Sequence, residues 1–125
     1  MTEQVVKGQC FECRVEDGYI SDRVWGKISH QEAEQCTHTL IDMAKRVHTD
    51  KLLIDIQELA WINDLTLRLR GTELFFEGSK HFKHIALFSN RPAITYLVTL
   101  LAKGGGLDTK SFGDSASAAG WLRSR

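Results

Sequence analysis

The chain has 125 residues, 42% of them hydrophobic and 26% charged, a composition typical of a folded domain and not of a disordered, fibrous or membrane-embedded protein. Its 16 basic and 16 acidic residues cancel, so no overall field attracts nucleic acid or an anionic membrane. The N-terminal residues lack the basic region and apolar core of a signal peptide, and no window reaches the roughly 18 to 20 apolar residues of a membrane span. We therefore expect one cytoplasmic domain, residues 1–125, with no nucleic-acid partner and no membrane insertion.

The chain begins with a pattern typical of an antiparallel hairpin. Residues 8–15 and 19–28 are strand-like, and the Asp17-Gly18 dipeptide between them is a strong signal for a tight turn. Gly26, inside the second segment, indicates a bulge or a close approach of another backbone segment. We expect Trp25 to pack in the core.

A helix is predicted next, over about residues 30–48. Ser29 and Glu32 form a capping box, in which the hydroxyl and the carboxylate each satisfy a backbone amide. Apolar residues then recur at helical spacing and define one buried stripe: Ala33, Cys36, Leu40, Met43, Ala44 and Val47. Glu32 belongs to the polar side opposite this stripe.

Residues 51–56 form a short apolar run that is broken by Asp55, a pattern typical of a strand covered on both faces. A carboxylate in such a strand needs a partner, so Asp55 either bonds backbone amides at the strand end or faces a site. The following side chains, Asn63 and Asp64, commonly cap helices. Residues 65–70 alternate like a strand, but length and the cap favour a helix over residues 63–80.

The rest of the chain continues the alternation of strands and helices. Residues 82–88 predict a buried strand, residues 89–92 begin a helix with Pro92 near its first turn, and residues 104–106 end that helix. A short strand over residues 109–112 precedes a terminal helix that is capped by Asp114 or Ser115. The order ββαβαβαβα predicts an α/β fold: a mixed sheet with an antiparallel N-terminal hairpin and right-handed parallel crossovers.

Neither the cysteines nor the histidines form a recognisable metal or redox motif. Cys10 and Cys13 match C-x-x-C, but strand alternation places their thiols on opposite faces, so ordinary thiols are favoured over redox or metal chemistry. The five histidines are not paired at helical spacing; they are His30, His38, His48, His81 and His84. We predict no metal site, no cofactor and no catalytic residue.

Taken together, these segments resemble the SpoIIAA-like family, whose fold is STAS-like, over nearly the whole chain. The resemblance depends on the sequences VWGKI at 24–28, LLIDI at 52–56 and FKHIAL at 82–87, and on Phe112 followed by the helix with Ala118-Ala119 and Trp121-Leu122. It implies a non-enzymatic binding or regulatory module. In related anti-sigma-factor antagonists, a serine in an Asp-Ser-Ser-Gly-type loop is phosphorylated to switch partner binding. Here Asp64 is kept and Thr66 offers a hydroxyl, but the second Ser-Gly pair is missing.

We therefore expect the binding or regulatory loop to contain Trp61, Asn63, Asp64 and Thr66, and to contact a protein partner or a second copy of the chain. Thr66 is a candidate phosphosite, because a phosphate at a helix N-terminus meets free amides and the positive end of the helix dipole; the alternative is that Thr66 and Asp64 only cap the helix. Trp61 fits the core, a partner interface or an apolar pocket. Similarity of relatives to CRAL-TRIO lipid-binding domains implies an alternative function, the carriage of a small apolar or lipid-like ligand.

Overall fold

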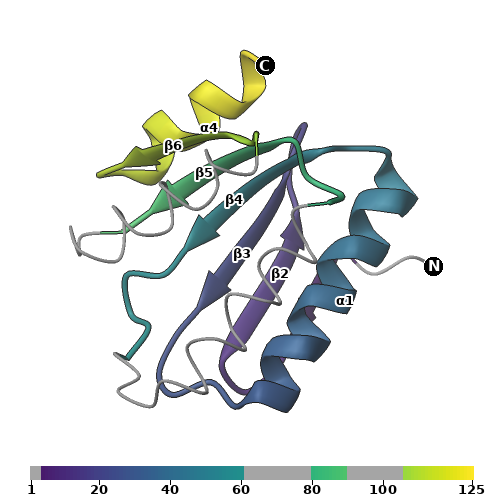
Figure 1. Cartoon of the computed structure of the whole chain (residues 1–125), viewed down its shortest axis with the longest axis vertical. Helices are drawn as coiled ribbons and strands as arrows, with labels where there is room; N and C mark the ends of the chain where they lie inside the picture. The colour runs from purple at the N-terminus through teal and green to yellow at the C-terminus, as the bar shows by residue number, and fades with distance from the viewer. Residues whose placement is uncertain (1–3, 61–79, 90–105) are drawn as a thin grey trace.

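The computed structural model describes residues 4–60, 80–89 and 106–125, which form one six-stranded sheet with helices on both of its faces (Figure 1). The strands follow one another across the sheet in chain order: β1 (Val5–Lys7), β2 (Phe11–Val15), β3 (Ile20–Val24), β4 (Lys51–Asp55), β5 (His84–Phe88) and β6 (Asp108–Phe112). The first three strands are antiparallel, and β3 to β6 are parallel. The predicted mixed sheet is confirmed. The two middle helices, predicted over 63–80 and from 89 on, fall in the segments 61–79 and 90–105, outside the described residues.

The turn at Asp17-Gly18 sets the register of the hairpin. Gly18 has φ +87°, a left-handed conformation that favours glycine, and the Glu16 amide donates to the Tyr19 carbonyl at 2.9 Å. The strand predicted over residues 19–28 is β3. It ends at Val24, earlier than predicted, because Gly26 turns the backbone with φ +65°.

The sequence analysis did not predict β1. This strand has three residues, too few for an alternating pattern to be recognised, and its existence depends on pairing with β2 through Val5↔Arg14 and Val6↔Cys13. The predicted first strand, residues 8–15, accordingly begins only at Phe11, and the chain turns between Lys7 and Phe11, where the Gly8 amide donates to the Phe11 carbonyl at 2.8 Å.

Helix α1 (His30–Val47) begins and ends where its capping residues predict. The Ser29 hydroxyl accepts the Glu32 amide at 3.1 Å, and His48 ends the helix in a left-handed conformation with φ 56°. The second half of the predicted capping box is wrong: the Glu32 carboxylate accepts the backbone amide of Cys10, so Glu32 is buried and does not lie on the polar side. Val47, predicted in the buried stripe, is 38% exposed, because it lies in the last turn beyond the edge of the sheet contact.

Among the described residues the core has two parts, one on each face of the sheet. The α1 cluster, between the sheet and α1, contains Phe11, Cys13, Ile20, Cys36, Leu40, Met43, Ala44, Leu52, Phe82 and Ile85. The α4 cluster, between the sheet and α4 (Ser115–Arg123), contains Tyr19, Leu53, Ala86, Ala118, Ala119 and Leu122. Leu52 and Leu53 of β4 thus point to opposite faces, which confirms that this strand is covered on both sides. In the part of the chain that the structure describes, no helix is both long and apolar enough to cross a membrane.

Candidate functional site

The predicted loop residues Trp61, Asn63, Asp64 and Thr66 lie outside the described residues, so the structure gives the approach to the loop and not the loop itself. The approach begins at the carboxyl end of β4. There the Asp55 carboxylate accepts the backbone amide of Gln57 at 3.1 Å. The first of the two roles expected for Asp55, bonding an amide at the strand end, is therefore confirmed.

Two backbone hydrogen bonds fix the chain that leads into the predicted loop. The Gly26 amide donates to the Glu58 carbonyl at 3.0 Å, and the Ala60 amide donates to the Gly26 carbonyl at 2.9 Å. They form a small parallel bridge between Gly26 and Leu59, which confirms the close backbone approach predicted at this glycine. The last described residue before Trp61 is therefore held beside the carboxyl ends of β3 and β4.

Next to this bridge lies an exposed group of two charges and an aromatic ring. Arg23 forms an ion pair with Glu58 at 2.9 Å, and its guanidinium lies 5.1 Å from the centre of the Trp25 ring. Trp25 is only partly buried, so its expected place in the core is wrong: it follows the last residue of β3 and lies outside both core clusters. An exposed ion pair contributes little to stability, which leaves these side chains available for contacts with a partner.

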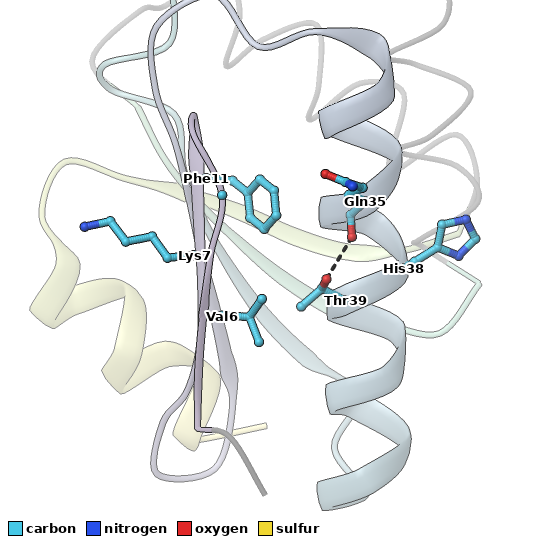
Figure 2. A pocket seen from close by; sticks show the side chains of 7 residues that line it. Val6, Lys7, Phe11, Gln35, His38 and Thr39 are labelled. Carbon is cyan, nitrogen blue, oxygen red and sulfur yellow. Dashed lines mark hydrogen bonds between the residues drawn. The ribbon is translucent and has the colours of Figure 1, made fainter.

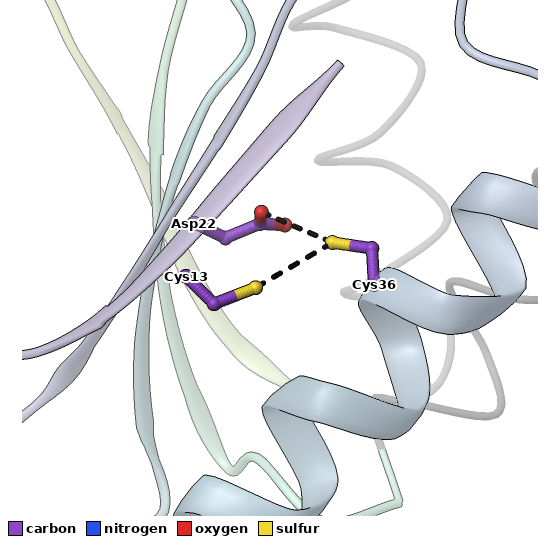
Figure 3. Close-up of side chains that lie close together, drawn as sticks. All are labelled: Cys13, Asp22 and Cys36. Atoms are coloured by element: carbon purple, nitrogen blue, oxygen red, sulfur yellow. Dashed lines mark hydrogen bonds between the residues drawn. The ribbon is translucent and has the colours of Figure 1, made fainter. Parts of the chain in front are cut away.

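A second group of neighbouring side chains, which the sequence analysis did not predict, lies under α1 (Figure 3). Cys13 of β2 and Asp22 of β3 are cross-strand partners and project from one face of the sheet toward Cys36 of α1. The two sulfur atoms are 3.8 Å apart, and the Cys36 thiol donates to Asp22 Oδ1 at 3.2 Å. All three side chains are buried. We refer to Cys13, Asp22 and Cys36 as the thiol–carboxylate trio.

Burial and hydrogen bonding shift the pKa values of Asp22 and Cys36. It raises the pKa of Asp22 to about 7, an effect that the hydrogen bond from Cys36 partly opposes and the charge of Asp55 increases. The hydrogen bond with Cys13 and burial both raise the pKa of Cys36 far above its usual range. The Cys36 thiol therefore stays protonated at neutral pH.

One local signal could have revealed part of the trio. A two-residue turn at Asp17-Gly18 places Cys13 opposite Asp22, as the structure shows. The position of Cys36 over this pair depends on how α1 packs. Cys10 precedes β2, and its sulfur lies 3.9 Å from the Lys27 carbonyl, outside the trio.

The histidines that the structure describes are distributed among separate contacts. His84 Nδ1 lies 2.9 Å from Asp108 Oδ2, and Arg125 Nε lies 3.1 Å from the same oxygen. His30 and His38 lie 4.0 Å and 3.9 Å from the Glu34 carboxylate. In the described residues, the three metal-ligating side chains that come together are those of the trio, whose donor atoms all lie within 4.8 Å of one another.

A hollow of about 440 Å³ lies between the β1–β2 corner and α1 (Figure 2). It is lined by Val6, Lys7, Gly8, Phe11, Gln35, His38 and Thr39. The Thr39 hydroxyl donates to the Gln35 carbonyl at 2.8 Å and so is already used within the helix. The hollow is largely open, whereas pockets for small ligands enclose most of the ligand surface. It therefore gives no support to carriage of an apolar ligand.

Comparisons with known proteins agree with this architecture. The chain resembles the crystal structure of an uncharacterised protein with a SpoIIAA-like fold from Shewanella loihica, with a TM-score of 0.68 and 24% identity over 94% of this chain and 90% of that one. It also resembles an anti-sigma factor antagonist from Mycobacterium paratuberculosis, with a TM-score of 0.62 and 14% identity over 90% of this chain and 92% of that one. At these identities the likeness shows the fold: the protein is a mixed α/β domain of the class that includes anti-sigma factor antagonists.

The family follows from the sequence itself. The SpoIIAA-like family model matches residues 20–123, and the chain therefore belongs to the SpoIIAA-like family. The chain matches none of the curated proteins with which it was compared.

Proposed function

We propose that this protein is a non-enzymatic regulatory module that binds a protein partner through the surface at the carboxyl ends of β3 and β4. This surface comprises Arg23, Trp25 and Glu58, together with the adjoining loop residues Trp61, Asn63, Asp64 and Thr66. The anti-sigma factor antagonist with the same fold supports a function in protein binding.

The bridge between Gly26 and Leu59 is the observation that carries the proposal. It joins the chain after β3 to the chain after β4, so that Glu58 to Ala60, the residues that lead into the loop, are held next to Arg23. A preorganised surface of this kind loses less conformational entropy on binding than a free loop does. Arginine and tryptophan are also the side chains that most often dominate protein interfaces.

The distribution of perturbed groups favours binding over catalysis. Asp22 and Cys36, the described side chains with large pKa shifts, are buried beneath α1, where a substrate cannot reach them. The side chains at the strand ends are exposed charges and a ring, which suit recognition of a partner surface.

Thr66 gives the proposed surface a means of regulation. Phosphorylation would add about 1.5 to 2 negative charges to the loop, which would change the charge that a partner meets. The variant Thr66→Glu imitates part of this charge, and Thr66→Val removes the hydroxyl.

Site-directed photo-crosslinking tests the proposal. A benzophenone amino acid is placed at position 61 and, as a control, at the exposed position of Lys45, in the last turn of α1 and next to the opposite end of β4. We expect position 61 to crosslink one protein, or a second copy of the chain, that position 45 does not. With that partner purified, Trp61→Ala, Thr66→Glu and Arg23→Ala should each weaken binding by about tenfold or more, and Lys45→Ala should leave it unchanged. Equal binding by wild type and the Trp61 and Thr66 variants would contradict the proposal.

A further inference from the structure

The thiol–carboxylate trio brings three metal-ligating side chains together at one buried place. Cys13 and Asp22 are held side by side by the register of β2 and β3, and Cys36 is placed above them by α1 (Figure 3). The trio therefore joins three separate elements of the fold at one buried point. An ion bound there would link the helix to the hairpin.

The separation of the two sulfur atoms fits a tetrahedral ion. Thiolate–zinc bonds are about 2.3 Å long, so an ion bound to two sulfurs 3.8 Å apart would subtend about 110°, close to the tetrahedral angle. With a carboxylate bond of about 2.1 Å, the 3.2 Å between Cys36 Sγ and Asp22 Oδ1 corresponds to about 95°. The second carboxylate oxygen of Asp22 offers a fourth donor.

The charges around the trio also favour a cation. The neighbouring charge that acts on Asp22 is Asp55, another carboxylate, so the site has an excess of acidic groups. A bound divalent ion would compensate the buried negative charge and would replace the protons of the two thiols. Closed sites with thiolate donors select zinc and similar ions over magnesium or calcium.

We propose that Cys13, Asp22 and Cys36 bind one zinc ion that fastens α1 to the β2–β3 hairpin. Redox chemistry is the less suitable role, because both thiols are buried and thiol oxidation requires exposed, deprotonated sulfur. The ion is structural, since the site lies inside the α1 cluster, away from the surface proposed to bind a partner.

Metal titration of the reduced chain tests this site. The purified protein is stripped with a chelator, its three thiols are confirmed with a thiol reagent after denaturation, and it is then titrated with Co²⁺ and Cd²⁺. We expect one ion per chain, a sulfur-to-metal charge-transfer band, tetrahedral Co²⁺ absorption, and a higher Tm when Zn²⁺ is added.

The chain contains its own matched control. Cys10 is a third thiol outside the trio, so Cys10→Ser should bind the ions as wild type does. Cys36→Ala should abolish the charge-transfer band, and Asp22→Asn should weaken binding by about tenfold or more. Near-ultraviolet circular dichroism shows which variants are folded. If Cys36→Ala does not fold, the titration of the wild type decides: a reduced, folded wild type that shows no charge-transfer band overturns the proposal. A loss of metal binding in Cys10→Ser as large as that in Cys36→Ala also overturns it.

Discussion

The two faces of the sheet are packed by different chemistry. The α4 cluster is built from apolar and aromatic side chains alone, with Ala118, Ala119 and Leu122 of the helix lying on Leu53 and Ala86 of the strands. The α1 cluster is equally buried, yet it contains the two thiols of the trio and is bordered by the buried carboxyl groups of Asp22 and Glu32. Buried polar groups are costly unless they are satisfied. The comparison shows that α4 completes the core, whereas α1 also encloses polar groups that a core does not require.

The α4 face of the sheet is packed by both small and large side chains. Ala118 and Ala119 allow α4 to lie close to the sheet, and Leu122 fills the space with no exposed surface. Phe112 and Trp121 pack at the border of this cluster with ring centres 5.7 Å apart. Stability on this face is therefore expected to depend on volume and shape.

The largest predicted effect tests that view of the α4 face. Leu122→Ala should lower the free energy of unfolding by about 2–5 kcal/mol, because it leaves a cavity in a fully buried position. Urea denaturation measures the difference. The control Val47→Ala, at a position 38% exposed, should change stability by no more than about 0.5 kcal/mol. Similar decreases in the free energy of unfolding of the two variants would show that burial of Leu122 in the α4 cluster does not stabilise the fold as predicted.

Substitution of Gly8 and of Gly120 by alanine compares the space available on the two sides of the sheet. A Cβ at Gly8 would lie 2.3 Å from the ring of Phe11 and 2.8 Å from the Glu32 carboxylate, so Gly8→Ala should destabilise the protein by about 1–3 kcal/mol. A Cβ at Gly120 of α4 meets nothing within 4 Å, so Gly120→Ala should stabilise by about 0.5–1 kcal/mol through helix propensity. Thermal denaturation of the two variants should give Tm shifts of opposite sign. Tm shifts of the same sign would contradict this prediction, because they would mean that Phe11 and Glu32 move to accommodate the added methyl group at Gly8.

The smallest effect concerns the start of α4 and depends on pH. The Asp114 carboxylate caps the helix by accepting the Ser117 amide at 2.7 Å, and this bond, with that from the Ser117 hydroxyl, lowers the pKa of Asp114. A lowered folded-state pKa means that the stabilisation is present above the ordinary aspartate pKa of 3.8 and is lost as the pH falls through the folded value.

Asp114→Ala should therefore lower the Tm at pH 7, and its difference from wild type should shrink as the solution is acidified. The neutral variant Asp114→Asn keeps the capping geometry and serves as the control, with a stability that does not follow this titration. A difference between Asp114→Ala and wild type that stays constant down to strongly acidic pH would rule out the charged cap.

Much of this fold could be predicted because its signals are local. The turn at Asp17-Gly18, the cap at Ser29 and the apolar run in β4 each occupy a few consecutive residues, and the structure confirms all three. Such patterns report hydrogen bonds and faces within two to four positions along the chain. The predicted loop from Trp61 to Thr66 stays a prediction, supported by the fixed approach at Gly26.

By itself, then, the sequence determined the strands β2 to β6, the helices α1 and α4 with their caps, and the fact that β4 is covered on both faces. Only the tertiary structure decided that Val5–Lys7 adds a strand, that Glu32 reaches back to the Cys10 amide, and that Cys36 closes over Cys13 and Asp22. The physical reason is distance along the chain. Glu32 lies 22 positions from Cys10, and Cys36 lies 23 positions from Cys13 and 14 from Asp22. Side chains so far apart in the sequence become neighbours only when a helix packs on a sheet.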